Sequence, residues 1–326
     1  NFPGSFFLSD EFKLQASKRQ YPSTITLGDL NDDGYSDIAT ENGDAVLILF
    51  QDSTLPGQFF APLKITVGNT TDSLAIGDLN EDGLNDIAIG GFVKHLSILF
   101  QDVANPGNFL PIVSFGRLSD AVAIGDLKGD FINDIAITRE RDVKVLFQDP
   151  GAPGSFFVPV AFEVGKSPTS VKIGDLDKDG YQDLVVGNWG PADDFTEGSI
   201  SVLIQNSANP GDFFPAVNYT FSCRAGEISL GDLNDDGFLD IAAASQCENC
   251  RITILFQDIT NIGTFLPEKK YLCKPSYGDP WSIAIGDMNN DNINDLIISE
   301  DGFVIRFQDS ASPGNFLGRT KIYDPN

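Results

Sequence analysis

The stretch GDLNDDGYSDIA at residues 28–39 joins a cluster of acidic residues to a short apolar run. The second residue of this stretch is Asp29. The same pattern occurs five more times in the 326 residues, with Asp78, Asp126, Asp175, Asp232 and Asp287 in the place of Asp29. The intervals between these aspartates are 49, 48, 49, 57 and 55 residues. A near-constant period of this length is typical of repeat architectures, so we expect one structural unit to recur six times.

A second motif keeps the same period. It is an apolar run that ends in Phe-Gln-Asp, followed by a Pro-Gly turn and Phe, as at 50–59 and 100–109. In the first unit, β-branched and aromatic runs predict four short strands at about 24–27, 37–40, 45–50 and 59–67. No helical periodicity competes with this interpretation. Four strands per unit predict an all-β fold, a β-propeller of four-stranded antiparallel blades.

The copies set the expected domain organisation, a single propeller over residues 1–326. Its six units are expected at about 21–67, 70–116, 119–164, 167–221, 225–273 and 280–323. Residues 1–15 repeat only the turn and the fourth strand, with Pro3-Gly4 before Phe6-Phe7. We therefore favour six blades, with the surplus strand closing the ring or pairing with a neighbouring subunit. A seven-bladed ring cut through its first blade is the alternative.

The acidic loops have the spacing of a calcium site. Asp-x-Asn/Asp-x-Asp-Gly-x-x-Asp places side-chain oxygens at loop positions 1, 3, 5 and 9, similar to the opening of an EF-hand loop. A plain turn would not need facing carboxylates, which repel by about 4 kcal/mol at ~4 Å and an effective dielectric of ~20. With the carbonyl of position 7, the predicted ligands are Asp29, Asn31, Asp33, Tyr35, Asp37; Asp78, Asn80, Asp82, Leu84, Asp86; Asp126, Asp130, Asp134; Asp175, Asp177, Asp179, Tyr181, Asp183; Asp232, Asn234, Asp236, Phe238, Asp240; Asp287, Asn289, Asp291, Ile293, Asp295.

The six loops are not equivalent. The Asp175 loop has four carboxylates and is expected to bind most tightly. In the Asp287 loop Asn292 replaces Gly, which Asn tolerates because it adopts the left-handed region more easily than most residues. In the Asp126 loop Lys128 replaces a ligand and Phe131 replaces Gly, so we expect the Lys128 ammonium to stand in for the ion. The sequence thus predicts five or six Ca²⁺ ions, with a structural role.

The motif Ile-Gly-Asp-Leu-Asn-x-Asp-Gly-x-x-Asp-Ile-Ala resembles the FG-GAP/VCBS repeat family over nearly all of the chain. That family includes integrin α-subunit propellers, propeller-type lectins and propellers appended to polysaccharide-acting enzymes. The resemblance implies a calcium-binding propeller. It does not choose among adhesion, glycan recognition and catalysis.

The formal net charge of −26 argues against nucleic acid and anionic membrane surfaces as direct partners. No apolar run approaches the ~20 residues that would span a bilayer. Calcium loops and an even number of cysteines favour an extracellular protein, secreted or at the cell surface. The four cysteines, Cys223, Cys247, Cys250 and Cys273, are expected to form two disulfides, with a zinc site as the alternative.

The irregular residues all map to the blade ends opposite the calcium loops. An insertion contains Trp189, Asp193 and Asp194, while Tyr277 and Trp281 precede the last unit. Loop aromatics suit sugar or peptide recognition, although blade packing explains Trp281 more simply and Trp189 equally well. The repeated Phe pairs after Pro-Gly are expected in the core between blades, and His95 in a solvated turn.

These features favour a non-enzymatic binding or scaffold module, acting in adhesion, glycan recognition or surface assembly, with a glycan or protein ligand on the irregular face. The alternative is a polysaccharide-acting enzyme, or the non-catalytic propeller of one. A single His leaves no Ser-His-Asp arrangement. A carboxylate pair near Asp193, Asp194 and Glu197 would be needed instead.

Overall fold

The computed structural model describes residues 24–68, 71–191, 197–221, 223–246, 251–272, 280–299 and 303–323. The predicted surplus strand at 1–15 lies outside these residues. The described residues contain strands and no helix, and hence no helix long and apolar enough to cross a membrane. They form six antiparallel sheets, which confirms the all-β, six-bladed propeller class.

The chain divides into two compact units. The unit of Phe12–Phe162 with Ala208–Asp212 holds the first three sheets. Their strands are β1 (Ile25–Gly28), β2 (Asp37–Asn42), β3 (Ala45–Leu49) and β4 (Leu63–Thr66); β5 (Ser73–Gly77), β6 (Asp86–Leu99) and β7 (Val113–Ser119); β8 (Val122–Gly125), β9 (Asp134–Arg139), β10 (Asp142–Leu146) and β11 (Val160–Glu163). Strand β6 runs through the positions of both the second and the third strand, so the second sheet is recorded with three strands.

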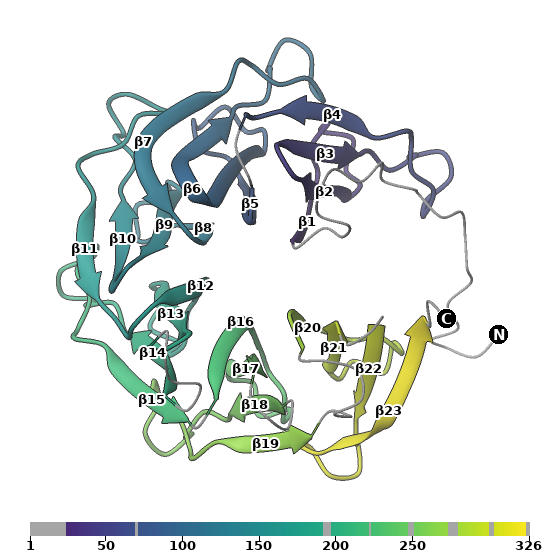
Figure 1. The fold of residues 1–326 in the computed structure, drawn as a ribbon, viewed down its shortest axis with the longest axis vertical. Coiled ribbons are helices and arrows are strands. Elements are labelled where there is room, and N and C mark those ends of the chain that lie inside the picture. Colours follow the sequence, from purple (N-terminus) through teal and green to yellow (C-terminus); the bar gives the residue numbers. More distant parts are fainter. Residues whose placement is uncertain are drawn as a thin grey trace. The chain divides into compact units, whose positions relative to one another are not determined.

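The other unit, Glu163–Ser207 with Phe213–Asn326, holds the remaining three sheets. Their strands are β12 (Pro168–Gly174), β13 (Asp183–Asn188), β14 (Gly198–Leu203) and β15 (Val217–Phe221); β16 (Arg224–Gly231), β17 (Asp240–Gln246), β18 (Arg251–Leu255) and β19 (Lys269–Leu272); β20 (Ile283–Gly286), β21 (Asp295–Ser299), β22 (Phe303–Gln308) and β23 (Phe316–Tyr323). In every sheet the strands lie side by side in chain order, as Figure 1 shows.

The register explains where the acidic loops lie. In each blade the residue before the first Asp pairs with the last Asp of the loop, as Gly28 does with Asp37 and Gly174 with Asp183. Each acidic loop is therefore the hairpin between the first two strands. The fourth strand of the first blade begins at Leu63 rather than at Phe59, because Phe59 makes only an isolated bridge to Gln51.

The core lies between successive sheets within each unit. One cluster joins Leu30 and Ile48 of the first sheet to Ile87 and Leu99 of the second, all at most 1% exposed. In four blades the glycine that precedes the Asp loop allows this close packing: Gly28, Gly77, Gly174 and Gly231. A Cβ on Gly28 would lie 2.7 Å from Ile76 of the next sheet, so no larger residue fits there without movement.

The prediction that both members of each Phe pair are core residues is wrong for the second member. Phe213 is 7% exposed, but Phe214 is 53% exposed, and Phe60 and Phe157 are 54% and 48% exposed. Successive side chains of an extended segment point to opposite sides, so only the first Phe of each pair can face the neighbouring blade.

Candidate metal centre

The Asp loops share an unusual backbone that the sequence pattern explains. Loop position 4 has a positive φ in every copy, including 59° at Asp32, Glu81, Lys178 and Asp235. Position 6 also has a positive φ, where four copies have Gly. Two left-handed residues so close together turn the chain sharply, which directs the alternate side chains at positions 1, 3 and 5 toward the inside of the loop.

The first and last aspartates hold this loop together. In the first blade Asp29 accepts the N–H of Asn31 and Asp33 on Oδ1, at 3.2 Å each, and that of Gly34 on Oδ2, at 2.8 Å. Asp37 at position 9 is fully buried and accepts the backbone N–H groups of Leu30 and Gln51 at 2.8 and 2.7 Å. The position-9 carboxylate therefore ties the loop to the segment just after the third strand, in addition to its predicted role as a ligand.

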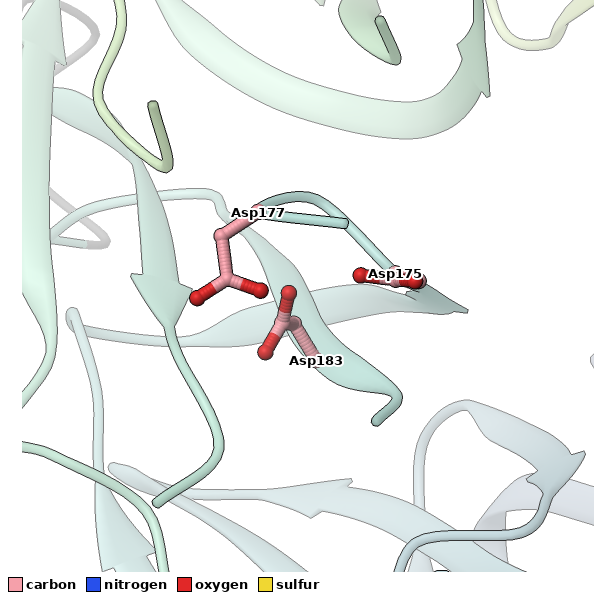
Figure 2. A group of neighbouring side chains, drawn as sticks. All are labelled: Asp175, Asp177 and Asp183. Atoms are coloured by element: carbon pink, nitrogen blue, oxygen red, sulfur yellow. The ribbon is translucent and has the colours of Figure 1, made fainter. Parts of the chain in front are cut away.

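The Asp175 loop matches the requirements of a cation most closely. Carboxylate oxygens of Asp175, Asp177 and Asp183 all lie within 4.8 Å of one another, and Figure 2 shows the three groups gathered at the loop. Oδ1 of Asp175 is buried and has no hydrogen-bond partner, whereas the equivalent oxygen of Asp29 accepts backbone N–H groups. A buried carboxylate oxygen without a partner is costly, and a bound cation would remove that cost.

The predicted ligands of the other loops are also brought together by their turns. In the Asp78 and Asp287 loops the position-3 amide donates to the position-5 carboxylate, Asn80 to Asp82 and Asn289 to Asp291, at 3.0 Å each. Asn292 adopts a φ of 64°, so the residue that replaces Gly keeps the loop geometry. With hard oxygen donors and hairpin spacing, these loops fit Ca²⁺, which would be held by the side chains at positions 1, 3, 5 and 9.

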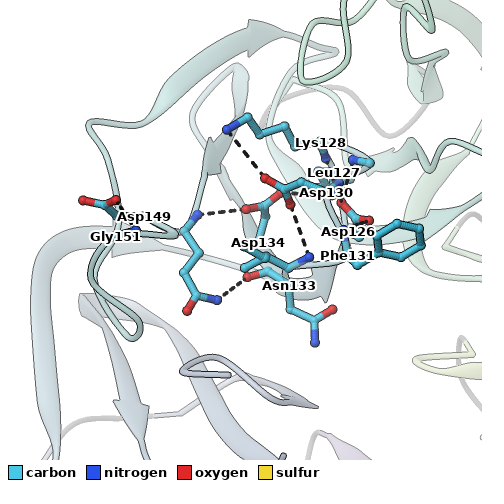
Figure 3. Close-up of polar contacts among 12 residues, drawn as sticks. Asp126, Leu127, Lys128, Asp130, Phe131, Asn133, Asp134, Asp149 and Gly151 are labelled. Atoms are coloured by element: carbon cyan, nitrogen blue, oxygen red, sulfur yellow. Dashed lines mark hydrogen bonds and ion pairs between the residues drawn. The ribbon is translucent and has the colours of Figure 1, made fainter. Parts of the chain in front are cut away.

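The Asp126 loop is the exception that the sequence predicts. Lys128 Nζ lies 3.6 Å from Oδ2 of Asp130, so a cation from the chain faces the acidic cluster (Figure 3). Asp126 accepts the chain's own N–H groups, including that of Gly129 at 2.6 Å, as Asp287 does with that of Asn290, so the ammonium is what distinguishes this loop. Phe131 has a φ of 65° and is 98% exposed, turned away from the cluster in Figure 3. The loop keeps the shape of its counterparts and carries a different charge.

A glutamine in each blade supports the loop and was missed from the sequence. Gln257 is 2% exposed. Its Nε2 donates to the carbonyl of Leu239 at 3.0 Å, and its Oε1 accepts the N–H of Gly263 at 3.2 Å, in the turn where this blade has Ile-Gly in place of Pro-Gly. Four other blades repeat both bonds, through Gln51, Gln101, Gln148 and Gln308. The signal was the recurrence of Gln in the Phe-Gln-Asp motif.

The two tryptophans lie at the opposite ends of their strands from the Asp loops. Trp189 directly follows β13 and is half-buried, with the Arg224 guanidinium carbon 5.1 Å from its ring centroid. Trp281 precedes β20 and is 69% exposed, so the expectation that Trp281 serves blade packing is wrong. Its carbonyl lies near Gly226, in the bulged stretch of β16 that Arg224 begins. Asp193, Asp194 and Tyr277 lie outside the described residues.

Two smaller predictions concern Cys223 and His95. Cys223 is the only cysteine among the described residues and is fully buried. Cys247, Cys250 and Cys273 lie outside them, so the pairing stays a prediction. His95 is exposed as expected, but it belongs to strand β6, where it pairs with Leu118, rather than to a turn.

The fold and its recurring Asp loops define a repeat β-propeller. Residues 126–186 and 232–298 match the family model of the FG-GAP-like repeat, and together with the six sheets these two matches fit an FG-GAP repeat propeller. A lectin of Agrocybe aegerita, whose structure was solved to explain specific recognition of non-reducing terminal N-acetylglucosamine, is similar in structure. The TM-score is 0.61 at 16% sequence identity, over 93% of this chain and 80% of that chain, a likeness that shows the fold alone. The search of curated proteins found no match.

The ion-free loops are expected to make stability depend on pH. Burial raises the pKa of Asp86, Asp134, Asp183 and Asp240 to about 7, despite the backbone N–H groups that favour their charged form. Because the unfolded value is about 3.9, protonation stabilises the fold fully below pH ~4, and this contribution is lost as the pH rises through about 7. Calcium-free protein should therefore melt at a higher temperature at pH ~5.5 than at pH ~8. Thermal melts followed by circular dichroism, on protein dialysed free of calcium, would measure this, and an unchanged or opposite order would contradict it.

Proposed function

We propose that this chain is an extracellular, calcium-stabilised binding propeller that recognises glycans at the blade ends opposite its Asp loops. The observation that carries the proposal is Trp281, a large aromatic side chain that is 69% exposed at the blade ends opposite the Asp loops. Exposed Trp is enriched where proteins contact ligands, because it offers a large, rigid apolar surface. The structural similarity to a lectin supports this class of ligand.

Trp281 suits this role better than Trp189. The Arg224 guanidinium lies against the Trp189 ring and is itself only 7% exposed, so this pair contributes to packing between the fourth and fifth blades. Trp281 keeps most of its surface open to a ligand. We infer that Trp281 stacks on a sugar ring and that Trp189 supports the neighbouring surface.

The calcium part of the proposal rests on the Asp175 loop, where an orphaned carboxylate oxygen faces two further aspartates. We infer five calcium ions, at every loop except that of Asp126. At millimolar Ca²⁺ and affinities of about 10⁻⁴–10⁻³ M, each ion would contribute about 0.5–1.5 kcal/mol to stability. The ions would stabilise the blades that carry the binding face.

Glycan-array screening in millimolar calcium, followed by calorimetric titration of the best ligand, tests this proposal. We expect Trp281→Ala to weaken binding by about tenfold or more, since a stacked Trp commonly contributes ~2 kcal/mol or more. Trp189→Ala should chiefly lower the melting temperature. Phe131→Ala removes an aromatic side chain that is even more exposed than Trp281, from the Asp-loop end, and should leave binding unchanged. Absence of any glycan ligand, or equal losses in the Trp281 and Phe131 variants, would refute the assignment.

A further inference from the structure

In the second to sixth blades, the turn before the fourth strand (Pro-Gly, or Ile-Gly in the fifth blade) contacts the Asp loop of the preceding blade. A Cβ placed on Gly263 of the fifth blade would lie 3.4 Å from Cβ of Asp177, in the fourth blade's loop. A Cβ on Gly107 would lie 3.3 Å from Cβ of Asn31. The same contact joins two further pairs, Gly154 with Asn80 and Gly314 with Asn234, at 3.5 and 3.3 Å. In all four pairs the residue touched is position 3 of the loop, whose side-chain oxygen is a predicted ligand.

These turns are held in place by their backbone conformation and by hydrogen bonds. Gly263 has a φ of 82°, which only glycine adopts readily, and Gln257 fixes its N–H. The side chain of Gln257 also donates to the carbonyl of Leu239, and its backbone N–H donates to the Asp240 carboxylate at 2.8 Å. The turn is therefore anchored to the fifth blade's Asp loop on one side and is in contact with the fourth blade's loop on the other.

Two further contacts join neighbouring loops directly. Asn294, at position 8 of the sixth blade's loop, donates to the carbonyl of Asp232, the first residue of the fifth loop, at 3.0 Å. Lys178 of the fourth loop lies 3.8 Å from the ring centroid of Phe238 at position 7 of the fifth loop. Equivalent amide bonds join Asn85 to Asp29 and Asn133 to Asp78.

We propose that Gly107, Gly154, Gly263 and Gly314 are positioning residues for the calcium sites of the preceding blades. Each glycine sets the position of a ligand in the preceding blade's loop, and is itself anchored to the Asp loop of its own blade. Calcium bound in one loop therefore favours calcium in the preceding loop. This inference rests on the proposed function, since it requires that the loops bind calcium.

Terbium luminescence can test a single site. Tb³⁺ replaces Ca²⁺ at oxygen-ligand sites and emits when a nearby tyrosine is excited. Among the six loops only the Asp29 and Asp175 copies carry tyrosine, Tyr35 and Tyr181, both at position 7. With Tyr35→Phe in the background, emission reports the Asp175 site alone. We expect Gly263→Ala to weaken terbium binding there by about 10–100-fold, the usual effect of changing a residue that orients a ligand.

Gly211→Ala is the matched control. Gly211 has a φ of 90°, and a Cβ there would lie 3.4 Å from Cγ of Lys128, in the loop that is not expected to bind calcium. Both alanines strain the backbone alike, so both variants should lose similar stability in calcium-free buffer, and only Gly263→Ala should lose terbium affinity. Gly57, at φ 89° with no atom within 4 Å of its Cβ position, provides a second control.

The pair of Gly107 and Tyr35 repeats the test in the other unit, with Tyr181→Phe in the background, should Gly263→Ala fail to fold. Equal terbium affinity in the Gly263 and Gly211 variants would overturn the inference while the calcium proposal stood. If the unsubstituted protein showed neither sensitised terbium emission nor calcium binding by calorimetric titration, the calcium proposal itself would be overturned.

Discussion

Alanine at Asp183 is expected to lower the free energy of unfolding by about 2–6 kcal/mol, because two buried N–H groups lose their acceptor at about 1–3 kcal/mol each. These groups belong to Leu176 and Gln205, at 2.8 and 2.7 Å from the carboxylate. In millimolar calcium the loss should grow by a further ~0.5–1.5 kcal/mol, since the tightest predicted ion is lost as well. Urea denaturation with and without calcium measures both parts.

Asp134→Ala separates the two contributions. Asp134 accepts the N–H groups of Leu127 and Gln148 at 3.0 and 2.8 Å, the same bonds that Asp183 makes, but in the loop where Lys128 faces the carboxylates. Its loss of stability should therefore be the same with and without calcium. If the two variants responded equally to calcium, the Asp183 carboxylate would have no role as a ligand.

The acidic loops and the strand order could be predicted from the sequence because the motifs that indicate them occur six times. A single Asp-Gly hairpin is ambiguous, but Asp29 and its five counterparts share both spacing and flanking strands. The six sheets and the exceptional Asp126 loop follow from that repetition. Repetition also misled: the Phe pairs recur because they alternate between core and surface, and periodicity alone does not give the direction of each side chain.

Contacts between blades could not be predicted from the sequence. The bond from Asn294 to Asp232 spans 62 residues, and the contact of Gly263 with Asp177 depends on how one sheet packs against the next. The exposure of Trp281 was missed for a different reason. An irregular residue has no repeated context, so its packing depends on local backbone such as the bulge of β16 rather than on a pattern.

Lys128→Asn combined with Phe131→Gly is expected to create a calcium site in the third blade. The substitutions replace the ammonium beside Asp130 with an amide oxygen and place Gly where φ is already 65°. The remaining ligands, Asp126 and Asp134, are in place, and Gly129 already supplies the left-handed turn at position 4. Calorimetric titration should find one more bound ion than in the unsubstituted protein, and calcium should raise the melting temperature by a larger amount.

The single variant Phe131→Gly separates the effect of backbone strain at residue 131 from the effect of calcium binding. A non-glycine residue in the left-handed region costs about 1–2 kcal/mol, so this variant should be more stable in any buffer, with an unchanged number of ions. The ion pair of Lys128 with Asp130 is partly exposed and contributes at most about 1 kcal/mol, so its loss is smaller than this gain. The double variant should thus fold well in calcium-free buffer. An unchanged number of bound ions in the double variant would show that Lys128 and Phe131 are not what excludes calcium from the Asp126 loop. Packing against the neighbouring turn would then be the cause.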